Sequence, residues 1–319
     1  MKKMKILVSL ITLTILSVEK TSAQYYFYDK RTYDSHIVYE VGGSVGVINS
    51  LTDLGGGKGT GKKFIKDVNI NKTNISGSFY VSATYKNIVA LRLEAAFGQV
   101  KASDAVLEKV KQTTFGRYER NLSFKSKITE FSLLAEVHPL YIFNHYNDDV
   151  DKTPPSFSPY LVAGVGYFSF NPQAKLNNRW IDLQPLSTEG QGFAEYPDRK
   201  KYTLKQANIP VGLGVKYELT SNINLRAEFI NRILFTDYLD DVSTNYIDQS
   251  LYANYFTGAK LTNALLLNDR QNELDPTHIT VEGNQRGNPK SNDSYFSFNL
   301  KIGYTFGREK IAKIAKCDN

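Results

Sequence analysis

The sequence predicts an all-β fold: an eight-stranded antiparallel transmembrane β-barrel with long extracellular loops. Three observations predict it. Residues 75–100 alternate apolar and polar side chains over two long runs that a tight turn separates. The same alternation recurs in five further segments, and a sixth segment is apolar on both sides. The links between segments are long on one side and mostly short on the other, as in outer-membrane barrels.

The segment 75–100 defines the pattern. Strands turn successive side chains to opposite faces, so a period of two separates an apolar face from a polar one. The polar face carries full charges such as Arg92 and Glu94 beside small residues. A transmembrane strand needs about 9–11 residues, apolar toward lipid and polar toward the lumen. The apolar positions are Ile75, Gly77, Phe79, Val81, Ala83 and Tyr85, then Val89, Leu91, Leu93, Ala95 and Phe97 after the Lys86-Asn87 turn.

The N-terminus predicts the compartment. Three lysines precede an apolar run from Ile6 to Val18, and Thr21-Ser22-Ala23 offers small residues for cleavage before Gln24. This is the pattern of a secretory signal peptide. A run of this length is too short to span about 30 Å of hydrocarbon as a helix. We therefore expect a signal peptide at 1–23, a barrel domain at 24–307 and a periplasmic tail at 308–319.

Composition excludes several classes of protein. Residues 1–23 hold four Lys and one Glu, so their removal lowers the formal charge from +7 to +4. That small excess does not indicate a nucleic-acid partner, which would require a concentrated basic face. The single cysteine, Cys317, excludes an internal disulfide framework and a cysteine-based zinc site. The chain has 21 Tyr and 18 Phe against one Trp, and this aromatic content favours a barrel over a helical membrane protein.

Taken in order, the segments give an even number of strands, as bacterial barrels require. In most of them the alternation assigns one face to lipid and the other to the lumen. Pro159–Phe170 is apolar on both sides, and its facing stays open. The eight predicted strands are His36–Ile48, Ile75–Lys86, Val89–Val100, Lys127–His138, Pro159–Phe170, Gln206–Leu219, Ile223–Phe235 and Ser294–Phe306.

The links support the same topology. If the first strand starts in the periplasm, both termini are periplasmic and four long links lie outside. On the periplasmic side Lys86-Asn87 and Thr220–Asn222 are tight, whereas Pro139–Ser158 is long. We therefore expect a multi-pass barrel in the outer membrane of a Gram-negative cell, with membrane lipid around it. The outer links are Asn49–Asn74, Lys101–Ser126, Asn171–Lys205 and Thr236–Asp293.

Eight strands enclose a lumen that side chains fill, so we expect no open channel. Six carboxylates and five cations fall on inward positions, and their signs nearly balance. Buried charges must pair and hydrogen-bond, which predicts a structural charge network rather than an ion pathway. The predicted network is Glu40, Arg92, Glu94, Glu130, Glu136, Lys216, Glu218, Arg226, Glu228, Arg232 and Lys301.

Two motifs suggest chemistry but do not support it. The run from Gly56 to Lys63 approaches a phosphate-binding P-loop, yet it lacks the Ser or Thr after the lysine and a following helix. We predict a flexible loop and no nucleotide. Glu136 and His138 share an inward face, but His138 lies at the periplasmic end, away from outer-leaflet lipid. The sequence alone supports no placement of a serine that would complete a triad with them, so we predict no catalytic residue.

The fourth outer loop offers candidate metal ligands. Asp237, Asp240 and Asp241 carry the oxygen atoms that calcium prefers. Their spacing does not match an EF-hand, and clustered aspartates in a loop are usually solvated. We therefore expect neither a metal nor a cofactor.

The chain resembles a family of Bacteroidota outer-membrane β-barrels that includes PorG-like components of the type IX secretion machinery. The resemblance covers most of the mature chain and implies association with a periplasmic ring of secretion proteins. The Pro139–Ser158 link and the C-terminal tail are the segments that would meet those partners. The residues that carry the resemblance are Ser50–Lys58, Phe64–Asp67, Leu183–Gly192, Tyr196–Lys200, Leu234–Ser243 and Ile302–Gly307.

Three functions follow from these observations. The first is a non-enzymatic, structural component of type IX secretion that tethers periplasmic partners to the outer membrane. The second is a stand-alone barrel that stabilises the envelope or binds surface ligands through its long outer loops. The third, a lipid-modifying enzyme, has the least support because no catalytic signature is present.

Overall fold

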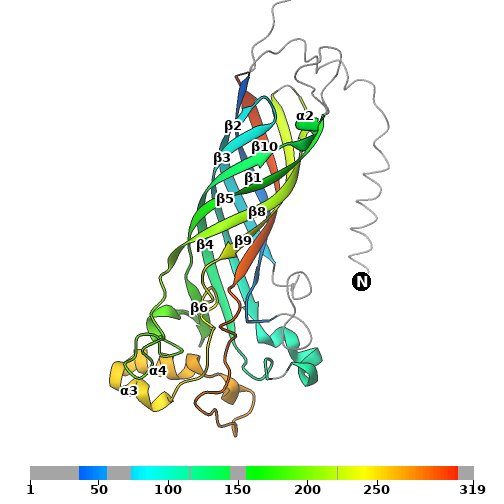
Figure 1. Cartoon of the computed structure of the whole chain (residues 1–319). Helices are drawn as coiled ribbons and strands as arrows, with labels where there is room; N and C mark the ends of the chain where they lie inside the picture. The colour runs from blue at the N-terminus through cyan, green and yellow to red at the C-terminus, as the bar shows by residue number, and fades with distance from the viewer. Residues whose placement is uncertain (1–35, 56–72, 115, 144–155, 221, 308–319) are drawn as a thin grey trace, which may run out of the picture.

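The computed structural model shows a closed barrel with a folded region at one end (Figure 1). The structure describes residues 36–55, 73–114, 116–143, 156–220 and 222–307. Eight antiparallel strands follow one another around the barrel, and the pairing of β3 with β4 closes it. The strands are β1 Ile37–Leu51, β2 Asn74–Tyr85, β3 Val89–Ser103, β4 Ser123–Val137, β5 Phe157–Ser169, β8 Lys205–Glu218, β9 Ile223–Leu234 and β10 Ser294–Phe306.

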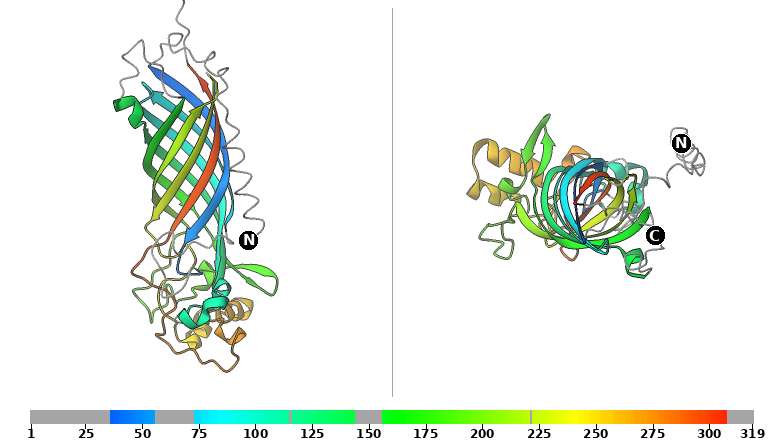
Figure 2. Two further views of the ribbon diagram at one scale, coloured as in Figure 1. Left: turned by 90° about the vertical axis from the view of Figure 1, so that its right-hand side faces the viewer. Right: turned by 90° about the horizontal axis from the view of Figure 1, so that it is seen from above.

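The two ends of the barrel differ in what connects the strands. At one end, called here the turn end, Lys86 and Asn87 have positive φ angles of 48° and 57°. Two consecutive positive φ values make the type I′ turn that matches the twist of a β-hairpin. The short helix α2, Pro139–Phe143, lies at the same end (Figure 1). At the opposite end, called here the loop end, the long links are gathered (Figure 2).

The strands place apolar side chains outside and polar ones inside. Val45, Phe79 and Val165 are 70%, 72% and 63% exposed, whereas the inward neighbours on each strand are mostly buried. This is the inverse of a water-soluble barrel, and it is the distribution of a transmembrane β-barrel. The facing of β5, which the sequence left open, is settled: Tyr160 and Phe168 point inward. Among the described residues, the helices are too short and too polar to cross a bilayer.

The long links at the loop end fold into a compact region, which we call the head: residues 171–204 and 236–293 (Figure 1). Nine buried residues from both links share one apolar core: Ala174, Leu183, Leu186, Phe193, Ile247, Tyr252, Phe256, Ala264 and Leu267. The sequence predicted loops here and missed this order. The head contains the elements β6 Pro172–Leu176, β7 Arg179–Asp182, η6 Gln184–Leu186, η7 Gln249–Leu251, α3 Tyr252–Tyr255, α4 Gly258–Asn268 and η8 Gln271–Glu273.

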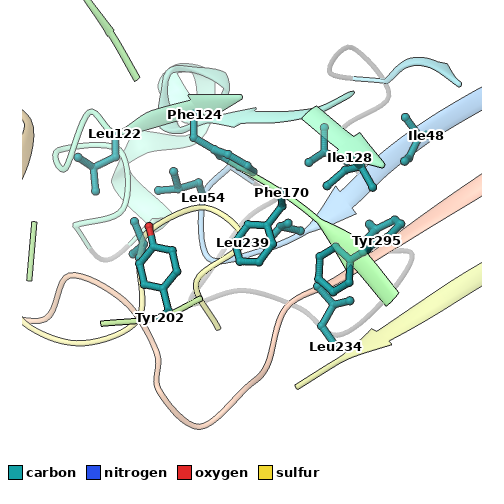
Figure 3. Close-up of a cluster of buried hydrophobic side chains, with 13 residues drawn as sticks. Ile48, Leu54, Leu122, Phe124, Ile128, Phe170, Tyr202, Leu234, Leu239 and Tyr295 are labelled. Atoms are coloured by element: carbon teal, nitrogen blue, oxygen red, sulfur yellow. The ribbon is translucent and has the colours of Figure 1, made fainter. Parts of the chain in front are cut away.

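A second apolar cluster lies at the loop-end mouth of the barrel, between the strands and the head, and Figure 3 shows its side chains. Strand residues such as Ile48 and Phe168 meet loop residues such as Leu239 and Val242 in it. Aromatic rings contribute to the contact, and Phe170 stacks on Tyr202 with their centroids 6.2 Å apart. The mouth cluster therefore joins the head to the barrel without an open passage between these residues.

The predicted strand ends need correction at the loop end. β3 continues to Ser103 and β4 begins at Ser123, so the predicted link from Lys101 to Ser126 is shorter than expected. The two strands keep pairing beyond the apolar belt, because Ser103 lies opposite Ser123. The link contains the helix η5, Asp104–Thr113. The predicted signal peptide at 1–23, the whole glycine-rich motif from Gly56 to Lys63, the middle of the Pro139–Ser158 link and the tail at 308–319 lie outside the described residues.

Candidate functional site

The eleven charged residues predicted for the lumen all lie inside the barrel. Nine of them form one continuous chain of ion pairs. From the turn end, Lys216 Nζ lies 3.7 Å from Glu218 Oε1 and 3.5 Å from Glu40 Oε2. Arg226 then joins two carboxylates, with Nη2 2.9 Å from Glu40 Oε2 and Nη1 2.8 Å from Glu136 Oε2.

Arg92 is the centre of this chain and has no solvent exposure. Its Nη1 lies 2.6 Å from Glu136 Oε1 and 2.8 Å from Glu228 Oε2, and its Nε lies 3.0 Å from Glu94 Oε2. Lys301 Nζ closes the arrangement at 2.7 Å from both Glu94 Oε2 and Glu228 Oε1. Each cation therefore touches two or three carboxylates, which offsets the cost of burying it.

Arg232 and Glu130 form a separate pair nearer the loop end. Arg232 Nε lies 3.1 Å from Glu130 Oε2, and Arg232 Nη1 donates to the Ile230 carbonyl at 3.0 Å. The Tyr295 hydroxyl also donates to Glu130 Oε2. The lumen is thus occupied by paired side chains over most of its length. This arrangement can hold the barrel rigid. Because the named side chains are paired with one another across the lumen, they do not line a wide aqueous channel.

Three inward tyrosines belong to this network and were not singled out in the sequence. Tyr80 donates to Glu40 Oε1 at 2.6 Å, and Tyr160 donates to Glu228 Oε2 at 2.8 Å. The Tyr80 ring fits because the facing position on β1 is Gly42: a Cβ there would lie 2.6 Å from the Tyr80 hydroxyl oxygen. An inward glycine opposite an inward tyrosine in the strand register is a sequence signal that could have identified this contact.

The turn end holds a small enclosed site around His138. The structure brings Ser158 to this histidine, with the Ser158 hydroxyl 3.0 Å from His138 Nδ1, while Glu136 Oε2 lies 3.5 Å from Nε2. A serine–histidine–carboxylate order is therefore present, which the sequence did not reveal. Both Ser158 and His138 are almost fully buried, and Glu136 already pairs with Arg92 and Arg226. Glu136 is therefore held by two guanidiniums, and the contact between Ser158 and His138 lies in a nearly buried site.

The three aspartates considered as metal ligands are buried rather than solvated, which corrects the sequence prediction. Asp241 accepts hydrogen bonds from the hydroxyls of Tyr202, at 2.6 Å, and Thr188. Asp240 accepts from the backbone N–H groups of Leu54 and Val242. Within the part of the chain that the structure describes, no group of carboxylates, histidines or cysteines is arranged to hold a metal ion.

Asp237 instead belongs to a cluster of four carboxyls at the head–barrel junction, with Asp53, Asp240 and Asp293. Burial raises the pKa of Asp237 to about 9, and the charge of Asp53 adds to the shift. Burial likewise raises the pKa of Asp53 to about 6, opposed by the N–H of Asn288 and by Arg120. Burial and the neighbouring carboxyls also hold the pKa of Asp293 well above its usual range. With a pKa of about 9, Asp237 keeps its proton at neutral pH.

Glu189 and Arg286 tie together the two links that build the head. Arg286 Nη1 lies 2.9 Å from Glu189 Oε1 and also donates to the Asp241 carbonyl at 2.8 Å. Glu189 accepts further hydrogen bonds from the backbone N–H groups of Ser243 and Thr244, at 3.0 and 2.9 Å. Both charged side chains are buried. Because one carboxylate contacts a segment more than fifty residues away, it fixes the two links in one arrangement.

Comparison with known proteins gives one family match. The family described as a domain of unknown function (DUF6089) matches residues 31–258. No curated protein matches the chain. Among solved structures, a major outer membrane protein from Thermus thermophilus is 13% identical with a TM-score of 0.37, covering 84% of this chain and 99% of that one.

Two further solved structures are similar at the same level. The outer membrane protein OprG from Pseudomonas aeruginosa is 11% identical with a TM-score of 0.35, covering 86% of this chain and 98% of that one. Ail, the attachment invasion locus protein of Yersinia pestis, solved with a heparin analogue, is 11% identical with a TM-score of 0.34, covering 84% of this chain and 99% of that one. At these values the similarity carries no functional argument.

Proposed function

The chain belongs to the family described as the domain of unknown function DUF6089, whose description names no activity, and we propose a function from the geometry. We propose that the protein is a non-enzymatic outer-membrane β-barrel that anchors a folded head at the cell surface. The head then acts as the stabilising or ligand-binding part, and the barrel acts as its support.

The observation that carries this proposal is the contrast between a filled barrel and an ordered head. Arg92 and Lys301 each bridge carboxylates across the lumen, so the interior serves rigidity. The head has its own apolar core and a buried ion pair between Glu189 and Arg286. Ordering two long links costs conformational entropy, and binding residues are disproportionately found on loops that a rigid scaffold positions.

Surface exposure of the head is the direct test. Intact cells that produce the protein should lose the head to added trypsin, whereas the strands should stay protected until the membrane is opened. Purified protein in planar bilayers should give no steady conductance, because side chains fill the lumen. A head protected in intact cells, or a stable open channel, would contradict the proposal. A matched control is a variant in which residues 172–204 and 237–292 are replaced by short turns. If the barrel supports the head and not the reverse, this variant should still fold as a barrel and remain heat-modifiable on gels.

A second candidate is the tethering role in type IX secretion that the resemblance implies. It is supported by the Pro139–Ser158 link, which is longer than two adjacent antiparallel strands need. The first part of this link forms α2, and Tyr141 within it is buried against the turn end, with its ring 6.5 Å from that of His138. In this candidate function, the Pro139–Ser158 link is a segment that contacts a periplasmic partner.

This second candidate makes a different prediction. Replacing Asn144–Pro155 by an Asn-Gly turn, together with deletion of Arg308–Asn319, should leave a heat-modifiable barrel. Export of type IX cargo should fall, and periplasmic secretion proteins should no longer co-purify. Normal export and co-purification in this double variant would refute the tether. Loss of these properties in the head-deleted variant alone would instead assign them to the head.

A further inference from the structure

An outward-facing group of lysines lies on the barrel wall just beyond the apolar belt, at the loop end. Lys101 on β3 lies directly opposite Lys125 on β4, and Lys127 follows on the same face of β4. The sheet continues from β4 into β6, where Lys125 lies opposite Gln173 and Lys175 follows on the same face. Cross-strand partners share a face, so these four lysines form one surface, which we call the lysine face.

The lysine face lacks internal compensation. Like charges directly opposite in a sheet destabilise it, and Lys101 and Lys125 are such a pair. None of the four lysines lies within 4.0 Å of a carboxylate in the described part of the chain. Asp182 on β7 shares the face, but its Oδ1 accepts from the amides of Asn171 and Gln173. The face therefore retains an excess of positive charge for an external anion.

Trp180 lies within this face. It is opposite Lys175 in the β6–β7 hairpin, and the Lys125 ammonium sits 3.8 Å from the centre of its ring. The indole is 45% exposed, although it is a large apolar group. The hairpin projects sideways from the barrel at the loop end (Figure 2, left). Tryptophan beside lysine is the combination that membrane proteins place at the level of the lipid headgroups.

The position of the lysines along the strands matches the level of the lipid headgroups. On β3 the last large apolar outward residue is Phe97, and Lys101 follows four residues later. On β4 the order from the belt is Phe131, then Lys127, then Lys125. Strands rise about 3.3 Å per residue, so the lysines begin within roughly 15 Å of the edge of the belt along the strand. Their side chains therefore reach the headgroup layer rather than the hydrocarbon.

We propose that the lysine face, with Trp180, binds the phosphate groups of an anionic lipid in the leaflet at the loop end. This inference rests on the proposed function in one respect, namely that the barrel spans a membrane. The ammonium groups supply the charge, and the indole lies against the acyl–headgroup boundary. Charge complementarity favours phosphate because a membrane surface supplies no other dense array of anions at this depth.

The chain has a single tryptophan, so its fluorescence reports on this face alone. The full-length mature protein is folded into phosphatidylcholine vesicles, and Trp180 emission is followed as lipid A, a phosphorylated glycolipid, is added. We expect a saturable change in emission. Dephosphorylated lipid A and inorganic phosphate should not reproduce it, because the first lacks the anion and the second lacks the acyl anchor.

The test variant replaces Lys101, Lys127 and Lys175 with Gln and keeps Lys125 on the Trp180 ring. Each lysine near an anionic surface contributes about 1 kcal/mol, so affinity for lipid A should fall about a hundredfold. The matched control makes the same change of charge in the head, at the exposed residues Lys200, Lys260 and Lys290, and should bind normally.

Three outcomes would overturn the inference. These are unchanged affinity in the test variant, an equal response to dephosphorylated lipid A, or saturation by inorganic phosphate. Heat-modifiability on gels is measured in parallel. A heat-modifiable barrel without a lipid A response rejects the lysine face alone, whereas a chain that never becomes heat-modifiable rejects the proposed membrane barrel itself.

Discussion

The barrel and the head of this protein bury opposite kinds of side chain: the barrel encloses charged residues, and the head encloses apolar ones. The barrel encloses nine linked charged residues and exposes residues such as Phe79 and Leu93. The head encloses apolar residues such as Phe193 and Leu267 and exposes mostly polar ones. The distribution of apolar and polar residues in the head suits a surface in contact with water, whereas that of the barrel suits a surface in contact with lipid.

Both regions nevertheless use buried ion pairs, and the difference lies in how many partners each charge has. Arg92 touches three carboxylates, whereas Glu189 has one arginine and two backbone N–H groups. In the barrel, the loss of one charge leaves other charges unbalanced. In the head, backbone hydrogen bonds remain to compensate the loss. The following predictions test this distinction, starting with the largest effect.

Arg92→Met should destabilise the barrel most. It leaves the carboxylates of Glu94, Glu136 and Glu228 short of one cation in a site without solvent. Removing one partner of a buried ion pair costs about 3–5 kcal/mol. Urea unfolding from lipid vesicles measures the loss. The adjacent outward change Leu93→Met is the control and should cost less than about 1.5 kcal/mol, because it conserves volume against lipid. Equal losses of unfolding free energy in the two variants would contradict the assignment of Arg92 to the lumen and Leu93 to the lipid face.

Arg286→Met should destabilise the head and leave the barrel folded. The expected loss in the free energy of unfolding is about 3 kcal/mol, the lower end of the range for a broken buried ion pair, because Glu189 keeps its backbone donors. Limited proteolysis should cut the head faster while the strands stay heat-modifiable. The partly exposed pair of Arg270 and Glu273 gives the control, since Arg270→Gln should cost at most about 1 kcal/mol. A barrel that unfolds together with the head would show that the two regions are not separate units.

Ala163→Arg places a charge in the middle of the apolar belt, with Ala135 and Val211 as its cross-strand neighbours. The cost should be about 2–4 kcal/mol, and it should fall to about 0–1 kcal/mol near the edge of the belt. Ala207→Arg, at the loop end of β8, tests this dependence on depth with the same change of residue. Folding titrations into vesicles measure both variants. Similar costs at the two depths would argue against a bilayer around these strands.

The smallest effect concerns protonation of Asp237. Because the folded-state pKa of about 9 exceeds the ordinary value of 3.8, this carboxyl contributes stability below about pH 4 that is lost as the pH rises toward 9. Head stability should therefore decrease between pH 5 and pH 9. Asp237→Asn should flatten that dependence and stabilise the head at pH 8 by roughly 1–3 kcal/mol. Thermal unfolding of the head at pH 5 and pH 8 provides the measurement, and a steeper dependence in the variant would contradict the assignment.

The barrel could be predicted from the sequence because its strands obey a local rule. Alternation alone places Arg92 inside and Leu93 outside, and the structure agrees. Where alternation is weak, as in β5, the facing required the register with β4 and β8. The contacts of the inward tyrosines also required the strand pairing. Gly42 on β1 makes room for the Tyr80 ring only because it lies directly opposite Tyr80 on β2.

The head could not be predicted, because its order depends on contacts between distant segments. Glu189 and Arg286 are 97 residues apart, and nothing near either one predicts the other. The aspartates at 237, 240 and 241 appeared solvated in the sequence because charged loop residues usually are. Asp240 and Asp241 are buried because the Leu54 backbone N–H and the hydroxyls of Thr188 and Tyr202, all from other segments, donate to them. The contact of Ser158 with His138 was missed for the same reason.

The facing of neighbouring residues on one strand tests the central claim most directly. Single cysteines at Ser82 and Ala83, in a Cys317→Ser background, are exposed to a thiol reagent that partitions only into the bilayer. Ser82 is buried toward the lumen, and Ala83 faces outward between Tyr39 and Leu91. Position 83 should react and position 82 should not. Reaction at 82 without reaction at 83 would contradict the inside-out barrel on which the account depends.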